Sequence, residues 1–273
     1  MFIRRRSPVK KNLMAPADSV SLPMYAINRA DVDAQWQHLR RLLAEQGVAA
    51  AGLALSWPAD LAAHWQDPQL LLSQTCGYPF MTMLPDVQPV GCFHYDAPGC
   101  EGIGYRSFLL VRQRETGAEL RDFRQRRAVC NSADSYSGYH ALRAMTAPMA
   151  AGGHFFSQII FSGGHEQSLI ALQREEADIA AVDCVTYALL QRHRPERIRG
   201  LKTIGRTPLA PGLPLITQRH TSPATLAALR TALLGLVSAP EHREVCRAVL
   251  IKGFSPVSRR QYDVILQSPG NGI

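Results

Sequence analysis

The sequence predicts a two-lobed α/β protein with a cleft between its lobes. Its 273 residues are 46% hydrophobic and 19% charged, which suits a folded protein with a substantial core. Short apolar runs alternate with amphipathic helical stretches, as in sheets covered by helices. This alternation pauses near residue 112 and then restarts. Two such blocks joined by extended segments indicate two lobes, each a mixed sheet flanked by helices.

The first block begins with an expected strand over 20–26. A helix over 32–45 follows, because Val32, Trp36, Leu39 and Leu43 share one helical face and Gly47 provides a stop. The next expected elements are a strand at 51–55, a helix at 59–65, a strand at 70–74, a loop at 75–79, and strands at 87–94 and 105–112.

The second block repeats the pattern. Its expected strands are 127–130, 157–161, 179–182 and 201–206, and its expected helices are 139–145, 166–176 and 185–192. Three prolines then precede a strand at 215–218, helices at 222–236 and 240–250, and a polar C-terminal tail.

These elements predict a discontinuous first lobe, because the C-terminal helices are expected to return to it. Lobe I would comprise 20–111 and 207–273, lobe II would comprise 112–206, and 1–19 would form a basic tail. The chain would cross between lobes near Arg112 and Arg206, and these crossings would serve as the hinge.

The net charge of +8 raises the question of a nucleic-acid partner. The basic clusters are not interleaved with stacking aromatic residues, so we do not expect nucleic-acid binding. The charge instead favours small anionic solutes. No apolar run approaches the ~18 residues that predict a membrane-spanning helix, so no membrane insertion is expected.

The N-terminus leaves the location open. Met1 to Lys11 is basic, as in a signal peptide, but 12–20 is not a continuous apolar segment. Both an exported and a cytoplasmic protein fit this pattern.

The cysteines show no C-x-x-C spacing, which argues against a zinc site or a redox dithiol. We expect no metal and no cofactor. Buried free thiols are the simplest interpretation, and a Cys76–Cys100 bridge is the alternative for an exported protein. The sequence leaves open the disulfide state of Cys76, Cys92, Cys100, Cys130, Cys184 and Cys246.

Two strand-to-helix turns in the second block carry the chemical signal. One, 131–138, is rich in serine, and the other is Ser162-Gly163-Gly164-His165. Amides at helix starts and serine hydroxyls bind anions, and open α/β sheets bind ligands at the carboxyl ends of their strands. Asp183 ends the next strand. The alternative is that these residues only cap helices and shape loops.

Catalytic motifs are not found. The 135–138 turn lacks the glycine of a G-x-S-x-G elbow, and Leu169 stands where a zinc-binding H-E-x-x-H helix needs its second histidine. No G-x-G-x-x-G and no phosphate-binding lysine motif occur. An enzyme is therefore not expected.

The order of these motifs resembles the phosphonate-type substrate-binding proteins of ABC transporters, which have type 2 periplasmic-binding-protein folds. The resemblance rests on Ser135-x-Ser137-Gly138, on 162–165, on the Ala177-to-Asp183 strand, and on 201–204 with 211–214. It covers most of residues 21–218.

The resemblance implies a solute-binding protein that captures a phosphonate or phosphate-like anion in the periplasm and delivers it to an ABC permease. A monomer is expected. By position, Ser135, Tyr136 and Ser137 would hold the anion's oxygens and His165 would donate a hydrogen bond. Asp183 would meet an amino group on the ligand. The first lobe would contribute two tyrosines, Tyr25 and Tyr78.

Two other functions stay open. One is a cytoplasmic ligand sensor, or an orphan binding domain, of the same fold. The other is an enzyme that resembles pyrimidine-precursor synthases, for which Cys76 and Cys184 are the candidate reactive residues.

Overall fold

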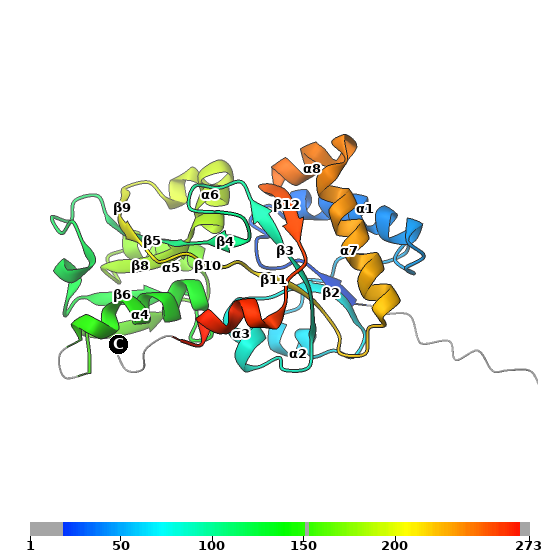
Figure 1. Ribbon diagram of the computed structural model, residues 1–273. Helices are drawn as coiled ribbons and strands as arrows, with labels where there is room; N and C mark the ends of the chain where they lie inside the picture. Colours follow the sequence, from blue (N-terminus) through cyan, green and yellow to red (C-terminus); the bar gives the residue numbers. More distant parts are fainter. Residues whose placement is uncertain (1–18, 151–152, 268–273) are drawn as a thin grey trace, which may run out of the picture.

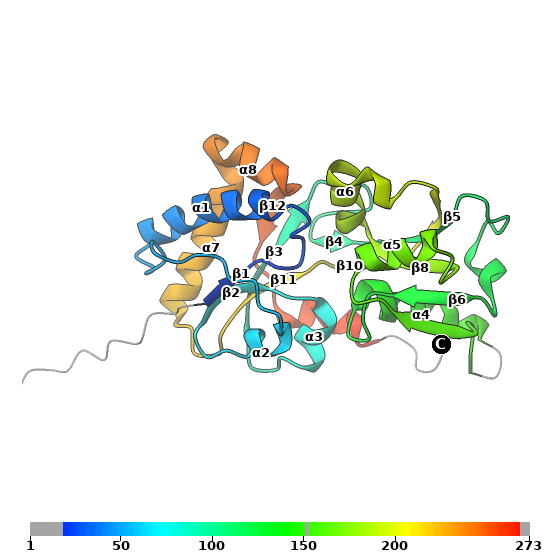
Figure 2. The ribbon, with the colours of Figure 1, turned by 180° about the vertical axis from the view of Figure 1, so that it is seen from behind.

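The structure, a computed structural model, describes residues 19–150 and 153–267. Two five-stranded mixed sheets, each with its own helices, lie side by side (Figures 1 and 2). We call the sheet that contains the first strand lobe I and the other lobe II. This architecture confirms the predicted two-lobed α/β class.

Lobe I has the strand order β1-β2-β11-β3-β12. β1 runs parallel to β2, and the other neighbours are antiparallel. Helices α1, α7 and α8 lie on one side of this sheet and α2 and α3 lie towards the other (Figure 1). The bounds are β1 Ser19–Ser21, α1 Arg29–Glu45, α2 Leu61–Trp65, β2 Leu70–Gln74, α3 Gly77–Thr82, β3 Gln88–Tyr95, β11 Pro214–Thr217, α7 Pro223–Ser238, α8 Arg243–Ala248 and β12 Ile251–Ser255.

Lobe II has the strand order β7-β6-β8-β5-β9. β6 is parallel to both β7 and β8, whereas β5 is antiparallel to β8 and β9. The bounds are β5 Ser107–Arg112, β6 Arg127–Cys130, α4 Ala141–Thr146, β7 Gln158–Phe161, α5 His165–Gln173, β8 Ile179–Asp183, α6 Cys184–His193 and β9 Leu201–Arg206.

The chain crosses between the sheets on two adjacent segments. β4 (Gly104–Tyr105) and β10 (Ala210–Pro211) pair there as a short antiparallel ribbon. The expected strand 105–112 is broken at Arg106, and its second part, β5, lies in lobe II. The first crossing is therefore near Arg106 and not near Arg112. The second follows the end of β9 at Arg206, where the Thr207 N–H donates to the Ser107 carbonyl over 2.9 Å.

Most predicted elements are present, and α1 buries the four predicted apolar side chains. The segment 51–55 is not a strand; its Leu53 carbonyl accepts a hydrogen bond from the Trp36 indole. The predicted first strand is reduced to β1. The segment 75–79, predicted as a loop, contains the start of α3 at Gly77. The basic tail lies almost wholly outside the described residues.

The predicted polar C-terminal tail is wrong. It contains β12, which pairs with β3, and a 3-10 helix at Arg259–Ile265 that packs against α3 and β10. Its apolar residues form only short runs, such as Val264 to Leu266, so no long hydrophobic segment marks it. Ile251, Phe254, Tyr262 and Ile265 are nevertheless buried.

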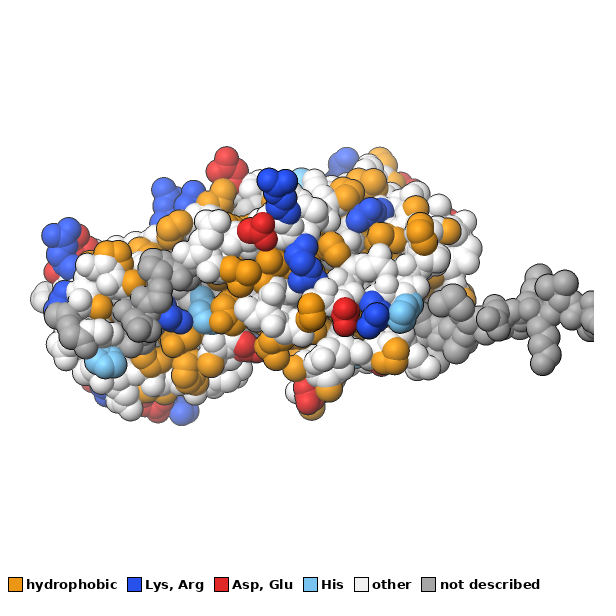
Figure 3. Space-filling model, turned by 60° about the horizontal axis from the view of Figure 1, so that its bottom comes forward, with side chains coloured by type: hydrophobic (Ala, Val, Ile, Leu, Met, Phe, Trp, Pro, Cys, Tyr) orange, Lys and Arg blue, Asp and Glu red, His pale blue; other side chains and the backbone are white. Residues whose placement is uncertain are grey.

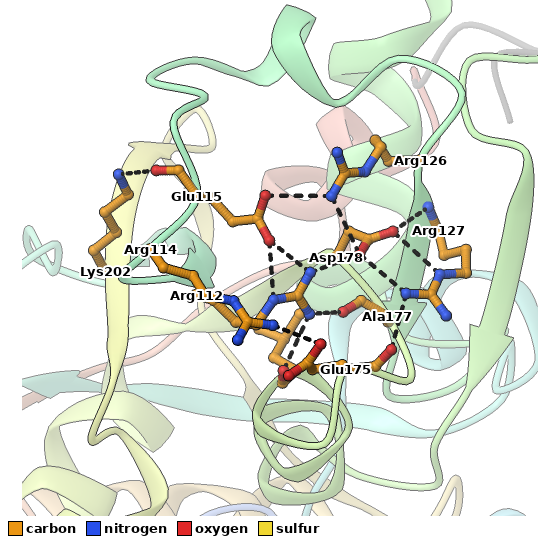
Figure 4. Close-up of polar contacts among 10 residues, drawn as sticks. Arg112, Arg114, Glu115, Arg126, Arg127, Glu175, Ala177, Asp178 and Lys202 are labelled. Atoms are coloured by element: carbon orange, nitrogen blue, oxygen red, sulfur yellow. Dashed lines mark hydrogen bonds and ion pairs between the residues drawn. The ribbon is translucent and has the colours of Figure 1, made fainter.

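An ionic network closes the end of lobe II (Figure 4). Arg112 donates to Asp178 and to Glu115, each over 2.6 Å, and both Arg126 and Arg127 also pair with Asp178. Arg112 also donates to the carbonyls of Leu172 and Ala177. Because these groups bridge β5, β6 and the segment before β8, the network fixes the sheet at the end opposite the carboxyl ends of β6 and β8.

Basic side chains are dispersed on the face shown in Figure 3, where they alternate with apolar and neutral ones. Within the described residues no single helix is long and apolar enough to cross a membrane. The segments Pro223–Ser238 and Pro240–Ala248 together meet the length and composition criteria but are bent by 81°.

Candidate functional site

The parallel strands β7, β6 and β8 end at one edge of lobe II, and a cavity of about 800 Å³ lies at this edge. Carboxyl ends of adjacent parallel strands meet on the same side of a sheet. The turns that follow the three strands therefore meet there. Both predicted turns line this one cavity, through Ser135, Ser137, Gly163, Gly164 and His165, and Asp183 completes the wall.

The serine-rich turn opens a π-helical turn at Tyr136–His140 that continues into α4. Ser135 caps it: its Oγ accepts the Gly138 N–H over 3.1 Å. A Cβ at position 138 would overlap Asn131 Oδ1, so a larger residue there would displace the Asn131 side chain. The Ser137 carbonyl accepts the Ser107 hydroxyl over 2.9 Å, which ties the turn to β5.

The glycine turn opens α5. Gly163 has φ of 89°, in the left-handed region that glycine adopts without strain. The Ser162 hydroxyl donates to the Gly164 carbonyl over 2.9 Å and lies 2.8 Å from Ser168 Oγ. This bonding holds the turn so that the first amides of α5 face the cavity edge, where the helix dipole favours negative charge.

His165 connects the two turns. Its Nε2 lies 3.1 Å from Ser137 Oγ and 3.3 Å from Asp183 Oδ2. Burial lowers the pKa of His165, and the nearby Asp183 opposes this effect. A neutral imidazole has one N–H. Placing it on Nε2 satisfies Asp183 and leaves Nδ1, which has no partner among the described residues, as an acceptor.

Asp183 is buried and serves as the N-cap of α6. Its Oδ1 accepts the backbone N–H groups of Val185 (3.1 Å) and Thr186 (2.9 Å). The second oxygen is turned towards His165. One carboxylate thus both stabilises a helix start and places a negative group at the cavity wall.

Tyr25 supplies part of the opposite wall from lobe I. Its ring packs edge-on against Tyr95, with centroids 4.9 Å apart. Burial, and next the Asp183 charge, raise the pKa of Tyr25. Tyr25 therefore keeps its proton and can donate a hydrogen bond.

The structure does not bring the other two predicted tyrosines to this cavity wall. Tyr78 stacks on His140 of lobe II. Tyr136 packs against apolar clusters that contain Tyr25 and Phe80, and its N–H donates to Cys76 Sγ over 3.4 Å. Both residues lie where the lobes touch, and their roles as ligand contacts remain predictions.

Several wall residues were not among the predicted site residues. Polar examples are Asn131, Tyr105, Gln167 and Thr186. Asn131 directly follows β6, so its position at a strand end was the available signal. Tyr105 is the first residue of the predicted continuous strand 105–112, and that prediction hid its place at the crossing.

The cavity wall is acidic in its ionisable side chains. Asp60, Asp134, Glu166 and Asp183 line it, whereas no lysine or arginine occurs among its described lining residues. Glu166 is paired with Arg194 and Arg197. An anion held here would therefore depend on hydroxyl and amide donors, such as those of the serine-rich turn and the glycine turn.

The cysteines give no support to the alternative of a Cys76–Cys100 bridge. Cys76 lines the cavity and receives the Tyr136 N–H, whereas Cys100 Sγ lies 3.4 Å from Cys184 Sγ. Burial raises the pKa of the Cys76 thiol. Cys76 is therefore a thiol at neutral pH, unlike the activated thiolate of a cysteine nucleophile.

No group of three or more His, Cys, Asp or Glu side chains suited to a metal ion occurs in the described part of the chain.

The structure has two mixed sheets joined by two crossings. Its cavity lies at the edge of one sheet and is also lined by the other lobe. This arrangement is that of the type 2 periplasmic-binding-protein fold. The chain belongs to the family described as "ABC transporter, phosphonate, periplasmic substrate-binding protein", which matches residues 58–262. This is a family of transporter substrate-binding proteins and not of enzymes.

Several known proteins are similar to this chain. The phosphonates-binding periplasmic protein of Escherichia coli is 26% identical over 95 residues, which are 35% of this chain and 27% of that protein. A binding-protein component of an ABC phosphonate transporter from Pseudomonas aeruginosa has a TM-score of 0.73 at 18% identity, covering 92% of this chain and 85% of that one. PhnD1 of Prochlorococcus marinus, in complex with methylphosphonate, has a TM-score of 0.74 at 14% identity, covering 93% and 97%.

Proposed function

We propose that this chain captures a small phosphonate or phosphate-like anion between its lobes and delivers it to an ABC permease from the periplasm. One observation carries the proposal: the serine-rich turn and the glycine turn border the same cavity. Membership of the phosphonate-binding family supports the transporter role.

Neutral donors would hold the anion. If His165 Nε2–H is given to Asp183, the Ser137 hydroxyl is free to donate to a ligand oxygen. The first amides of α5 add further donors with the favourable helix dipole. Ser135 contributes mainly by shaping the turn, since its Oγ already accepts the Gly138 N–H.

The acidic wall favours a ligand that also carries a positive group. A simple dianion near Asp183 would meet a buried negative charge without a lysine or arginine from the described lining to balance it. An amino group on the ligand would remove that conflict by pairing with the Asp183 carboxylate. We therefore propose an aminoalkylphosphonate as the preferred class.

A thermal-shift and calorimetry panel tests both levels of the proposal. The panel contains 2-aminoethylphosphonate, methylphosphonate, phosphate and sulfate. A bound ligand at a hundredfold excess over its Kd stabilises the folded protein by ~2.7 kcal/mol. No shift with any member would contradict the anion proposal as a whole.

The Asp183→Asn variant tests the amino-group contact. Asparagine keeps an oxygen that can accept the α6 amides but removes the charge. We expect at least a tenfold loss of affinity for 2-aminoethylphosphonate with little change for methylphosphonate. Equal losses for both ligands would assign Asp183 to the architecture of the site and not to the amine.

A further inference from the structure

A pair of cysteines lies outside the cavity wall, where lobe I meets lobe II. Cys100 Sγ and Cys184 Sγ are 3.4 Å apart. Cys184 is fully buried, whereas Cys100 is partly exposed. Disulfide formation brings two sulfurs to about 2.05 Å, so the pair needs only a small side-chain adjustment.

The two cysteines belong to different lobes. The loop of Cys100 follows β3 and is held on lobe I, where the Asp96 N–H donates to the Leu250 carbonyl and the Gly212 N–H to the Ile103 carbonyl. Cys184 begins α6 of lobe II, and its N–H donates to the Arg106 carbonyl at the crossing over 2.9 Å. A bond between the sulfurs would therefore join the lobes beside the hinge.

The backbone is shaped to allow this approach. Gly99 has φ of 98°, a conformation that side-chain-bearing residues rarely adopt. A Cβ at this position would also lie 3.1 Å from Cys184 Cβ and 3.3 Å from its Sγ. Glycine at 99 thus lets the loop come within contact of Cys184.

The chemistry of Cys184 suits thiol–disulfide exchange. The hydrogen bond from the Cys100 thiol lowers the pKa of Cys184, and this outweighs burial and the neighbouring Asp183, which act in the opposite direction. The sulfur also lies at the start of α6, where a helix dipole favours the thiolate. Family membership assigns a periplasmic setting, where disulfides form and persist.

We propose that Cys100 and Cys184 form a reversible disulfide that covalently links lobe I to lobe II. In the first step the proton of the partly exposed Cys100 passes to the Cys184 thiolate, and Cys100 Sγ attacks a sulfur of a disulfide oxidant and releases one thiolate of that oxidant, which takes the proton back from Cys184. Cys184, as its thiolate, then attacks Cys100 Sγ and releases the second thiol. Two protein thiols lose two electrons and two protons, and the oxidant's disulfide is reduced to two thiols. Because Asp183 immediately precedes Cys184, the bond also fixes the start of α6 at the cavity.

Thiol mapping tests the proposal on the full chain. The protein is incubated with oxidised glutathione, denatured, alkylated, digested and analysed by mass spectrometry without reduction. We expect one intramolecular cross-link between the peptides of Cys100 and Cys184, with the other four cysteines alkylated. Alkylation of all six, or a Cys76–Cys100 cross-link, would overturn the proposal.

Two variants separate this bond from other effects of oxidation. Cys100→Ser changes a partly exposed residue, so it should fold and should lose the cross-link; Cys130→Ser, in β6, should keep it. Oxidation should raise the Tm of the wild type by on the order of 5 °C and leave that of Cys100→Ser unchanged. An equal rise in Cys100→Ser would refute the assignment. None of these readouts depends on the ligand, so failure here leaves the proposed function untouched.

Discussion

The Tyr78 ring lies flat on the imidazole of His140, with centroids 3.6 Å apart and planes inclined by 16°. Tyr78 comes from α3 of lobe I and His140 from the turn before α4 of lobe II. The stack therefore joins the lobes outside the cavity wall. We propose that Tyr78 acts in closure of the lobes through this stack, while the ligand contact suggested by family resemblance stays a prediction.

Removing the stack should weaken ligand binding through closure. Aromatic pairs contribute about 0.5–1.5 kcal/mol beyond their buried area. We expect Tyr78→Ala to reduce ligand affinity by about three- to tenfold, measured by calorimetry. Tyr78→Phe keeps the ring and is the matched control. A Phe variant as weak as the Ala variant would show that the hydroxyl, and not the stack, matters.

The stack should also respond to acid. Burial lowers the pKa of His140 to about 4; Arg143 acts in the same direction, while the Ala133 carbonyl and Asp134 oppose it. An unfolded histidine titrates near 6.5, so between pH 6.5 and 4 the unfolded chain binds more protons at this site. The contribution of His140 to stability is complete above pH 6.5 and is lost as the pH falls towards 4. Urea unfolding should show a smaller decline over this window in His140→Gln than in the wild type, and identical slopes would contradict the assignment.

Substitutions of Ser137 and Ser135 should affect different properties, ligand affinity for Ser137 and stability for Ser135. Ser137 offers a hydroxyl to the cavity, whereas Ser135 caps the turn. We expect Ser137→Ala to lose about tenfold in ligand affinity, about 1.4 kcal/mol, with little change in stability. Ser135→Ala should lower the free energy of unfolding by about 1 kcal/mol. Calorimetry measures the affinity and urea unfolding the stability of both variants. An affinity loss only in Ser135→Ala, with a stability loss only in Ser137→Ala, would contradict these roles.

Elements with strong periodicity were predictable from the sequence, and those fixed by distant partners were not. The α1 face of Val32, Trp36, Leu39 and Leu43 recurs at helical spacing and is buried as predicted. β12 has no such signal, because its burial depends on other elements: it pairs with β3 and packs against α7. Likewise, the strand end at Asp183 marked a residue that lines the cavity. The contacts of Cys184 with Cys100 and of Tyr78 with His140 join different lobes, so they depend on how the lobes meet.

The ionic network of Figure 4 should dominate the stability of lobe II. Burial would raise the pKa of Asp178, but hydrogen bonds from Arg127 and Arg112 outweigh it and hold that pKa well below its usual range. Asp178→Asn leaves the buried Arg112 guanidinium without its full partner, and we expect a loss of about 3–5 kcal/mol in urea unfolding. The exposed Arg114–Glu175 pair is the control: Arg114→Ala should cost less than about 1 kcal/mol. Similar losses from both variants would count against a special role for Asp178.

Arg192 offers a test of closure that leaves the cavity intact. From α6 of lobe II it donates to the carbonyls of Arg247 (2.8 Å) and Ala248 (2.9 Å) at the end of α8 in lobe I. A cation is favourable at a helix C-terminus, but the contact is exposed, so its contribution is small. We expect Arg192→Ala to weaken ligand affinity about threefold and to increase the radius of gyration of the ligand-free protein in small-angle X-ray scattering. Arg174→Ala, which removes an exposed arginine elsewhere on lobe II, controls for the change in charge. If both variants lose ligand affinity equally, the change in charge alone explains the loss. If Arg192→Ala binds ligand like the wild type, the lobes are held together by the Tyr78–His140 stack and the buried contacts of α6, without help from this arginine.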